Sequence, residues 1–232
     1  MAVRPIAEGL WCVEAQMAIA GMPLSLRMTV MRGPGGGLVL HSPVELDDAT
    51  AEAIDALGPV EHIVAPSRMH HLYVLGAARR WPGAKLWAAP GLPAKRRDLG
   101  FDDVIGDRAP EALTDTLDVA LFVGAPVASE LLCLHRSSRT LVVVDLVFNI
   151  HSSSSLVSRL YLRSMGGWQR LAQTPVVRAM IRDREGARRS LERVFEWDFD
   201  RLVMAHGEIV ERGAKAQLAV ALEQIAPGLP HR

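Results

Sequence analysis

Short β-rich runs alternate with amphipathic helical patterns along most of the chain, and this alternation constrains the fold more than any other feature. The clearest run is Thr140–Asp145, which is almost wholly apolar up to its final carboxylate. Uninterrupted apolar runs are typical of strands that are covered on both faces. Strands that alternate with helices indicate a layered α/β domain, in which helices pack on the faces of the sheets.

Short turns between neighbouring runs indicate that the sheets are mixed rather than purely parallel. Leu26–Arg32 and Leu38–His41 are separated by GPGGG, whose residues tolerate unusual backbone angles and favour a hairpin. Arg136–Arg139 joins a second pair of runs in the same way. The remaining predicted strands are Leu10–Ala15, Glu61–Ala65, Lys85–Ala89, Val119–Val123, Leu131–His135 and Arg201–Ala205, and helices are predicted at 47–57, Leu72–Trp81, Ala187–Trp197 and Ala214–Ile225.

The segment His151–Gly186 differs from the rest of the chain. It opens with four serines and continues as amphipathic helical pieces that are broken at Gly166-Gly167 and Pro175. We interpret it as a helical insertion at about 151–186 that forms a lid over a site; a dimer contact and a membrane-surface patch are the alternatives. No Pro- or Ser-rich linker divides the chain, which predicts a single domain over residues 1–232.

Composition excludes several classes of partner. The 232 residues carry 26 basic and 26 acidic side chains, so the net charge is zero and no overall field attracts nucleic acid. No stretch reaches the ~18 apolar residues of a membrane span, and the first residues lack the apolar run of an export signal. Cys12 and Cys133 lie in apolar runs, as expected of buried reduced thiols in the cytosol. We expect a cytoplasmic protein with a small-molecule substrate, no nucleic-acid partner and no transmembrane segment, and a homodimer is left open.

Four side chains of ligand type lie where predicted strands end. His70 and His71 follow the strand Glu61–Ala65. Asp145 ends one later strand, and His206 follows another. Loops at the carboxyl ends of strands converge in α/β folds, and imidazole and carboxylate groups suit zinc and also iron or manganese. Taken singly, such a His is more often a surface or capping residue and such an Asp a helix cap, but their shared position predicts one divalent metal ion, zinc by preference, held by all four.

Four stretches carry a resemblance to a known family. They are HIVAPSRMHHL at 62–72, WPGAKLWAAPG at 81–91, SRTLVVVD at 138–145 and DRLVMAHG at 200–207. In these stretches the chain resembles the metallo-β-lactamase superfamily, and within it a bacterial branch whose HxHxDH motif is degenerate. The resemblance covers most of the chain apart from the 151–186 segment. It implies an αββα sandwich, with two mixed sheets packed face to face and helices outside.

The resemblance also shows at which positions this sequence differs from the family motif. When the HxHxDH motif is counted back from the Pro-Gly at 82–83, His71 falls on its last His and His70 on its Asp. Its first two His positions are then occupied by Pro66 and Arg68, neither of which binds zinc. One of the two family metal sites has therefore lost ligands.

The other family site is largely retained. The mid-chain His of the family falls near Pro126 and is absent, whereas Asp145 matches the bridging carboxylate and His206 the final His. The resemblance implies that His71 remains with these two, and that His70 replaces the missing carboxylate with another ligand. A single-metal centre follows.

Three further residues have candidate roles beside the metal. Arg68 could replace the lost positive charge or bind an anionic substrate, and a solvated loop Arg is the alternative. His41 falls where family members often have a supporting Asp, so it could orient a ligand or become one. Glu130 lies close to the missing mid-chain His and could be a replacement ligand or a base, with a strand-edge charge as the structural alternative.

These observations predict a metal-dependent hydrolase-like protein with one metal ion and a substrate that the sequence does not identify. A bound divalent ion lowers the pKa of water from 15.7 to about 7, and Glu130 or Asp145 would orient the water or accept its proton. The first alternative is a non-hydrolytic metal-binding protein on the same scaffold, because one fold hosts several chemistries. The second is a degenerate member without metal, in which His70 and His71 only form hydrogen bonds in the core.

Overall fold

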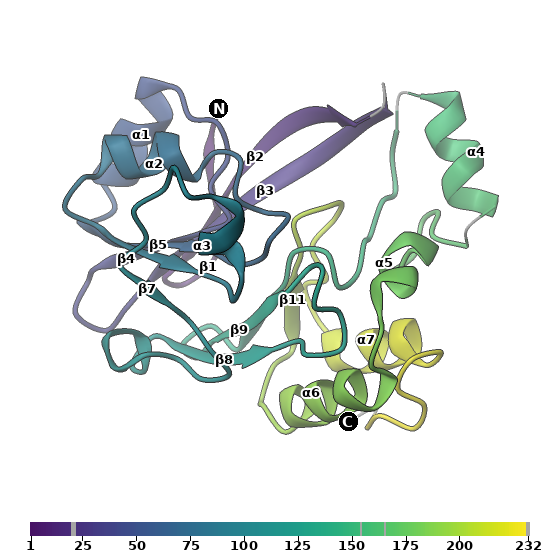
Figure 1. Cartoon of the computed structure of the whole chain (residues 1–232). Coiled ribbons are helices and arrows are strands. Elements are labelled where there is room, and N and C mark those ends of the chain that lie inside the picture. The colour runs from purple at the N-terminus through teal and green to yellow at the C-terminus, as the bar shows by residue number, and fades with distance from the viewer. Residues whose placement is uncertain (20–21, 154, 165, 231–232) are drawn as a thin grey trace.

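The computed structural model describes residues 1–19, 22–153, 155–164 and 166–230, and it places two β-sheets between layers of helices (Figure 1). The first sheet has seven strands in sequence order, and the second has four in the order β11-β10-β9-β8. The first sheet contains β1 Val3–Ala7, β2 Leu10–Ile19, β3 Met22–Arg32, β4 Leu38–His41, β5 Val60–Ala65, β6 Lys85–Ala88 and β7 Asp103–Val104. The second contains β8 Leu117–Leu121, β9 Leu131–His135, β10 Thr140–Val142 and β11 Arg201–Val203.

Both sheets are mixed, as the predicted hairpins require. In the first sheet β1 to β4 are antiparallel neighbours, whereas β4 to β7 run parallel. In the second sheet β8, β9 and β10 are antiparallel, and β11 lies parallel to β10. The turn at 33–37 closes the predicted hairpin, because the Gly33 amide donates to the Gly37 carbonyl at 2.9 Å.

The hairpin β2–β3 is longer than the sequence predicts. Its pairing continues beyond the predicted strand ends, at Ala15 and Leu26, as far as the pair Ile19 and Met22. The outer part contains Pro23, which is a signal against a strand because proline cannot donate to the ladder. This part of the hairpin is a strand because each arm pairs with the other, and a sequence pattern within one arm does not reveal that pairing. The extension carries side chains of the hairpin to the cavity described below.

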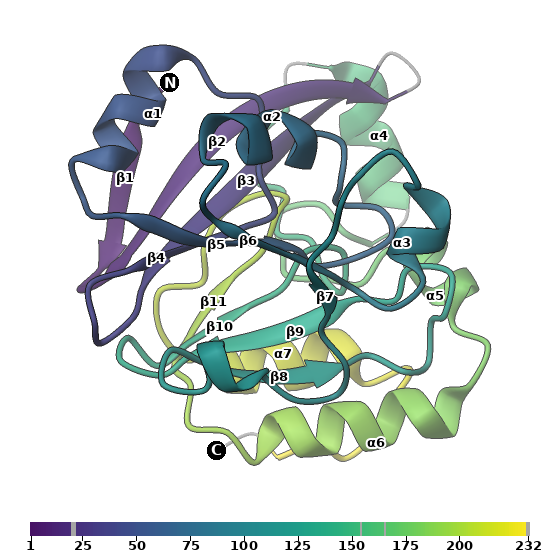
Figure 2. The same cartoon turned by 60° about the vertical axis from the view of Figure 1, so that its left-hand side comes forward.

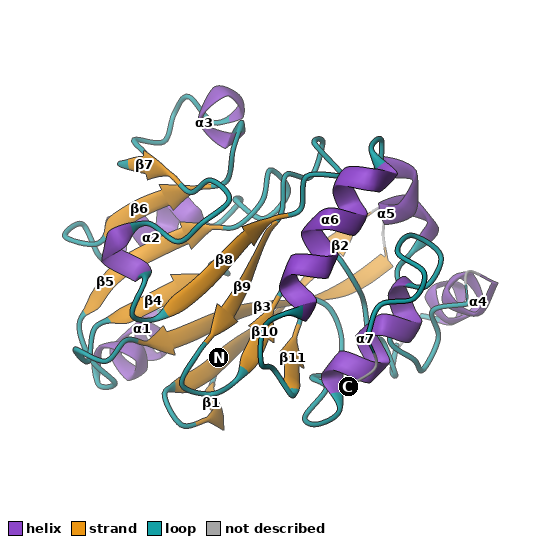
Figure 3. Cartoon of the chain, turned by 90° about the horizontal axis from the view of Figure 1, so that it is seen from below, coloured by secondary structure: helices purple, strands orange, loops and turns teal. Residues whose placement is uncertain are grey.

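Helices cover the outer face of each sheet, which confirms the αββα sandwich (Figures 2 and 3). The first sheet is covered by α1 Asp48–Asp55, α2 Val74–Arg80 and α3 Leu92–Lys95, and the second by α6 Arg184–Phe195 and α7 Ala214–Leu222. Asp47 caps the start of α1, with its Oδ1 accepting from the Thr50 amide at 2.7 Å. Between the sheets, Met31 and Trp87 of the first pack in one buried core with Cys133 of the second.

The segment that the sequence marks as an insertion forms two short helices at one side of the sandwich. α4 spans Leu156–Ser164 and lies beside β3, and α5 spans Pro175–Met180 (Figure 1). Thr174 begins α5, with its Oγ1 accepting from the Val177 amide. α6 already begins at Arg184, so the end of the predicted insertion belongs to that helix. None of the helices in the described part of the chain is long and apolar enough to cross a membrane.

Candidate metal centre

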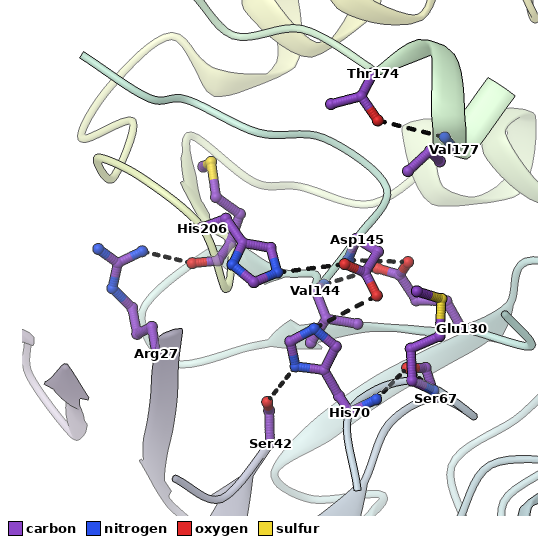
Figure 4. A network of polar contacts seen from close by, with 12 residues as sticks. Arg27, Ser42, Ser67, His70, Glu130, Val144, Asp145, Thr174, Val177 and His206 are labelled. Atoms are coloured by element: carbon purple, nitrogen blue, oxygen red, sulfur yellow. Dashed lines mark hydrogen bonds and ion pairs between the residues drawn. The ribbon is translucent and has the colours of Figure 1, made fainter. Parts of the chain in front are cut away.

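Three distant segments bring ligand-type side chains to one place, at the ends of strands from both sheets (Figure 4). His70 lies in the loop after β5, Asp145 follows β10, and His206 follows β11. β10 and β11 are parallel neighbours, so the segments that leave their carboxyl ends emerge at the same edge. One ligand atom from each of the three side chains lies within 4.8 Å of the others.

The two imidazoles face different oxygens of the same carboxylate. Nε2 of His70 lies 3.4 Å from Oδ2 of Asp145, and Nε2 of His206 lies 3.3 Å from Oδ1. Both separations exceed the roughly 2.7–2.9 Å of a short charge-assisted hydrogen bond. Oδ2 of Asp145 is buried and has no hydrogen-bond partner among the described residues. Atoms that could bind a metal therefore surround a common point, and they do not form short hydrogen bonds with one another.

The tautomer of His206 follows from its other contact. Its Nδ1 lies 2.6 Å from the backbone carbonyl of Ser25. A carbonyl oxygen only accepts, so Nδ1 carries a proton, and in the neutral form of the ring Nε2 would present its lone pair to Asp145. Phe148 stacks on the ring with centroids 4.8 Å apart and planes 10° apart. The ring is thus fixed in the tautomer and orientation that a metal ligand needs.

Gly207 lets another segment of the chain approach closely beside His206. Its φ is +93°, and a Cβ there would lie 2.2 Å from the carbonyl oxygen of Asn149. The Asn149 amide in turn donates to the His206 carbonyl at 3.2 Å. A larger residue at position 207 would push away the segment around Asn149, which follows Asp145, from the segment that carries His206.

His70 is oriented by two serines. Oγ of Ser42 contacts its Nδ1 at 2.8 Å, from a residue with φ +57° directly after β4. Oγ of Ser67 accepts from the amides of Met69 and His70 at 3.1 and 3.0 Å, which fixes the turn of the loop. These contacts leave Nε2 of His70 directed at Asp145 (Figure 4).

The electrostatics of the cluster favour a charged carboxylate. Burial raises the pKa of Asp145, but the neighbouring His70 and His206 lower it by more, so this pKa lies well below its usual range. Burial lowers the pKa of His70, but Asp145 raises it by more. The carboxylate is therefore ionised, and without another cation it attracts a proton onto an imidazole.

Glu130 supports the backbone beside the cluster and is not one of the three converging groups. Its buried carboxylate accepts from the amides of Val144 and Asp145 at 2.7 and 3.2 Å. Burial, and next the charge of Asp145, raises the pKa of Glu130 to about 7. Its two oxygens accept from backbone amides, so Glu130 holds the part of the chain that carries Asp145.

Of the two adjacent histidines that the sequence predicts as ligands, His70 belongs to the three converging groups and His71 does not. His71 lines the same cavity, but the described residues that gather around the common point include His70 and not His71. Nδ1 of His71 instead accepts from Nη1 of Arg96 at 2.9 Å. Burial, followed by the charges of Lys95 and Arg96, lowers the pKa of His71. The turn held by Ser67 directs two successive side chains to different partners, which motif counting does not reveal.

The two supporting residues of the prediction also lie outside the cluster. His41 is fully buried, and burial, together with the nearby His70, lowers its pKa to about 3. Its Nε2 has no hydrogen-bond partner among the described residues, so it lies beside the site as a neutral ring. Arg68 donates from Nη1 to the Pro126 carbonyl at 3.1 Å and packs against Gly91. That arrangement holds two loops together, and Arg68 is not among the residues that line the cavity.

A cavity of about 340 Å³ opens directly from the cluster. Its walls come from the β2–β3 hairpin, the loops after β4 and β5, and the segment 148–180, and they include Leu24, Val44, Tyr73, Leu162 and Met180. Part of the helical insertion therefore forms one wall of the cavity. All three residues of the cluster line this cavity, so a small ligand inside it can reach them.

Sequence reasoning missed the residues that hold the ligands in place. Ser42 and Ser67 act through hydroxyl groups next to the predicted site, and their proximity to His70 along the strand ends was the available signal. Phe148 lies three residues after Asp145 and stacks on the other histidine. Ser25 acts through its backbone carbonyl, for which no side-chain pattern exists.

The fold and the centre together define a protein of the metallo-β-lactamase fold. A metallo-β-lactamase from Pontibacter korlensis is similar to this chain at a TM-score of 0.66 and 14% identity, over 97% of this chain and 98% of that one. The metallo-β-lactamase FIM-1 from Pseudomonas aeruginosa, in its mono-zinc form, is similar at a TM-score of 0.60 and 14% identity, over 90% and 88% of the two chains. Another from Hirschia baltica gives 0.61 and 12%, over 90% and 91%.

Within that fold, the chain belongs to the family described as a domain of unknown function, DUF4336, whose model matches residues 7–165. His70 and Asp145 lie in the matched range, and His206 lies beyond it. No curated protein matches the chain. At identities of 12–14% the solved structures establish the fold and leave the chemistry to the site itself.

Proposed function

We propose that this protein is a metal-dependent hydrolase with a single zinc ion held by His70, Asp145 and His206. One observation carries the proposal: Nε2 of His206, whose ring is held through Nδ1 by the Ser25 carbonyl, lies 3.3 Å from an oxygen of the ionised Asp145 carboxylate. A lone pair and an anion repel unless a proton or a metal cation lies between them. The donor set of two imidazoles and one carboxylate fits zinc.

The number of ligands supports a catalytic rather than a structural ion. Structural zinc is usually closed by four protein ligands, whereas catalytic zinc has three and an open position. The described residues supply three groups, and the cluster opens into a cavity. A mono-zinc form is also known for FIM-1, which has the same fold. These features support a single ion with room for a substrate.

The residues of this chain would bind and orient, while the ion supplies Lewis acidity. When bound, a zinc ion lowers the pKa of a water molecule and polarises a carbonyl or phosphoryl oxygen. Asp145 contributes a negative ligand that Glu130 holds in place through the backbone amides of residues 144 and 145. Ser42 and the Ser25 carbonyl hold the two imidazoles, and Phe148 excludes water from one face of His206.

A non-hydrolytic iron protein is the second candidate, and the donor set itself supports it. Two histidines and one carboxylate with open positions also form the usual ligand set of non-haem Fe(II) oxygenases. A protein without metal, in which a proton on His70 satisfies Asp145, is the third. The three candidates differ in the metal that the protein retains.

Elemental analysis of protein purified without added metal tests the proposal. We expect about one equivalent of zinc, whereas one equivalent of iron would favour the second candidate and no metal, even after incubation with zinc, would reject metal binding. The ligands are tested with His70→Ala and His206→Ala, which should abolish stoichiometric zinc binding. The adjacent His71→Ala is the matched control and should retain zinc, because its Nδ1 is bonded to Arg96. Zinc loss in His71→Ala, with zinc kept in His70→Ala, would contradict the ligand set.

A further inference from the structure

The cavity beside the cluster is far more apolar than metal binding requires. Beyond the ligands, its wall is formed mainly by aliphatic and aromatic side chains, such as Leu24, Leu26, Phe148, Ile150, Val177 and Met180. These residues come from the β2–β3 hairpin and from the segment 148–180, so two separate parts of the chain present apolar groups to one space. A small polar substrate bound at the zinc ion would not contact these apolar side chains.

Few charged groups line the cavity. Among the described lining residues, the cluster and His71 are the only ones with acidic or basic side chains, and no Lys or Arg is present. An anionic group in the cavity away from these residues would therefore lack a counter-ion and would carry a large desolvation cost. The cavity is therefore suited to a ligand that is uncharged and apolar over most of its length and has a polar group only at the cluster.

The rim of the cavity is apolar as well. Met69, Leu72 and Val176 line it and are 39%, 57% and 52% exposed. Large exposed apolar side chains that gather at a pocket mouth indicate a binding surface. A ligand that enters here replaces water on apolar surface both at the rim and inside.

We propose that the cavity binds a linear alkyl chain of about ten carbons, carried by an amphiphile whose oxygen-bearing head lies at the His70–Asp145–His206 cluster. A methylene takes up roughly the room of a water molecule in the liquid, ~30 Å³, so about ten chain carbons fill the cavity of about 340 Å³. The ligand is a medium-chain acyl compound or one with a comparable alkyl tail. The proposal rests on the proposed function for the head group only.

A series of sodium alkanoates from butanoate to dodecanoate tests the chain site by calorimetry on zinc-loaded protein. The dissociation constant should fall by about fourfold per methylene, the value expected for burying a CH₂ group, up to about ten carbons. Octanedioate has the length of octanoate with a second charge at its far end, and it should bind at least ~100-fold more weakly. Equal affinity of octanoate and octanedioate, or no dependence on chain length, would overturn the proposal.

Two exposed valines provide matched variants. Val176→Asp places a charge at the rim of the cavity, at the second position of α5, where an acidic residue suits the helix. Val220→Asp makes the same change on α7, at a side chain that is 69% exposed and does not line this cavity. Octanoate affinity should fall at least about tenfold in the first and stay unchanged in the second. An equal effect of both substitutions would reject the assigned site.

Binding of 1-octanol to chelator-treated protein separates this inference from the proposed function. If octanol binds, and Val176→Asp abolishes its binding, the chain site stands even where no metal is retained. If zinc binds stoichiometrically but neither octanol nor octanoate binds, the alkyl-chain site is rejected and the metal centre stands.

Discussion

Replacing Arg27 by Met removes the contact that joins β3 to the segment with His206. The guanidinium is 5% exposed, and its Nη1 and Nη2 donate to the carbonyls of Met204 and Gly207, each at 2.5 Å. Hydrogen bonds from a charged donor contribute roughly 1.5–3 kcal/mol each, and both carbonyls lose this donor in the variant. The ion pair with Glu14 adds little, because that carboxylate is 47% exposed. We therefore expect Arg27→Met to lower the free energy of unfolding by about 3–5 kcal/mol.

Urea unfolding of metal-free protein measures this change without a contribution from zinc. Arg4→Met is the control, because Arg4 pairs with the same Glu14 oxygen but is 48% exposed, and it should cost less than about 1 kcal/mol. Since the two carbonyls flank His206, the zinc affinity of Arg27→Met should also fall by roughly tenfold or more. A loss below about 1 kcal/mol in Arg27→Met, or an equal loss in Arg4→Met, would refute the calculation.

The remaining predictions concern a ligand contact, the thiols and pH. Ser42→Ala removes the 2.8 Å contact to His70 and should weaken zinc binding by about 10–100-fold in a chelator competition, and unchanged affinity would show that Ser42 does not orient the ring. Burial raises the pKa of the Cys133 thiol to about 12 and also raises that of Cys12, so neither should react with a thiol reagent at pH 8 until the protein is unfolded. Burial lowers the pKa of His135, so the unfolded chain binds a proton that the folded chain does not, and stability should fall as the pH is lowered through about 6.5. His135→Gln should flatten this dependence by up to one proton, and an identical slope would contradict the assignment.

Local patterns predicted several elements and the mixed sheets, whereas the αββα arrangement came from the resemblance to a known family. The glycine-rich turn at 33–37 predicts the β3–β4 hairpin, the helical pattern at 47–57 predicts α1, and the apolar run into Asp145 predicts a buried strand. Each depends on backbone angles, capping or burial within a few neighbouring residues, which one sequence reveals directly. The β2–β3 extension was missed because its partner arm, and not its own composition, stabilises it.

For the site too, some features could be predicted from the sequence and others depended on the tertiary structure. The sequence by itself determined that His70, Asp145 and His206 lie at the ends of strands, because strand ends are readable from apolar runs and the residues that follow them. Only the tertiary structure decided that His70 and not His71 faces the carboxylate, because the choice depends on the turn at Ser67 and on Arg96 from another segment. Contacts between distant segments also made the apolar cavity, whose walls lie more than a hundred residues apart in the chain and become neighbours only when the two sheets pack together.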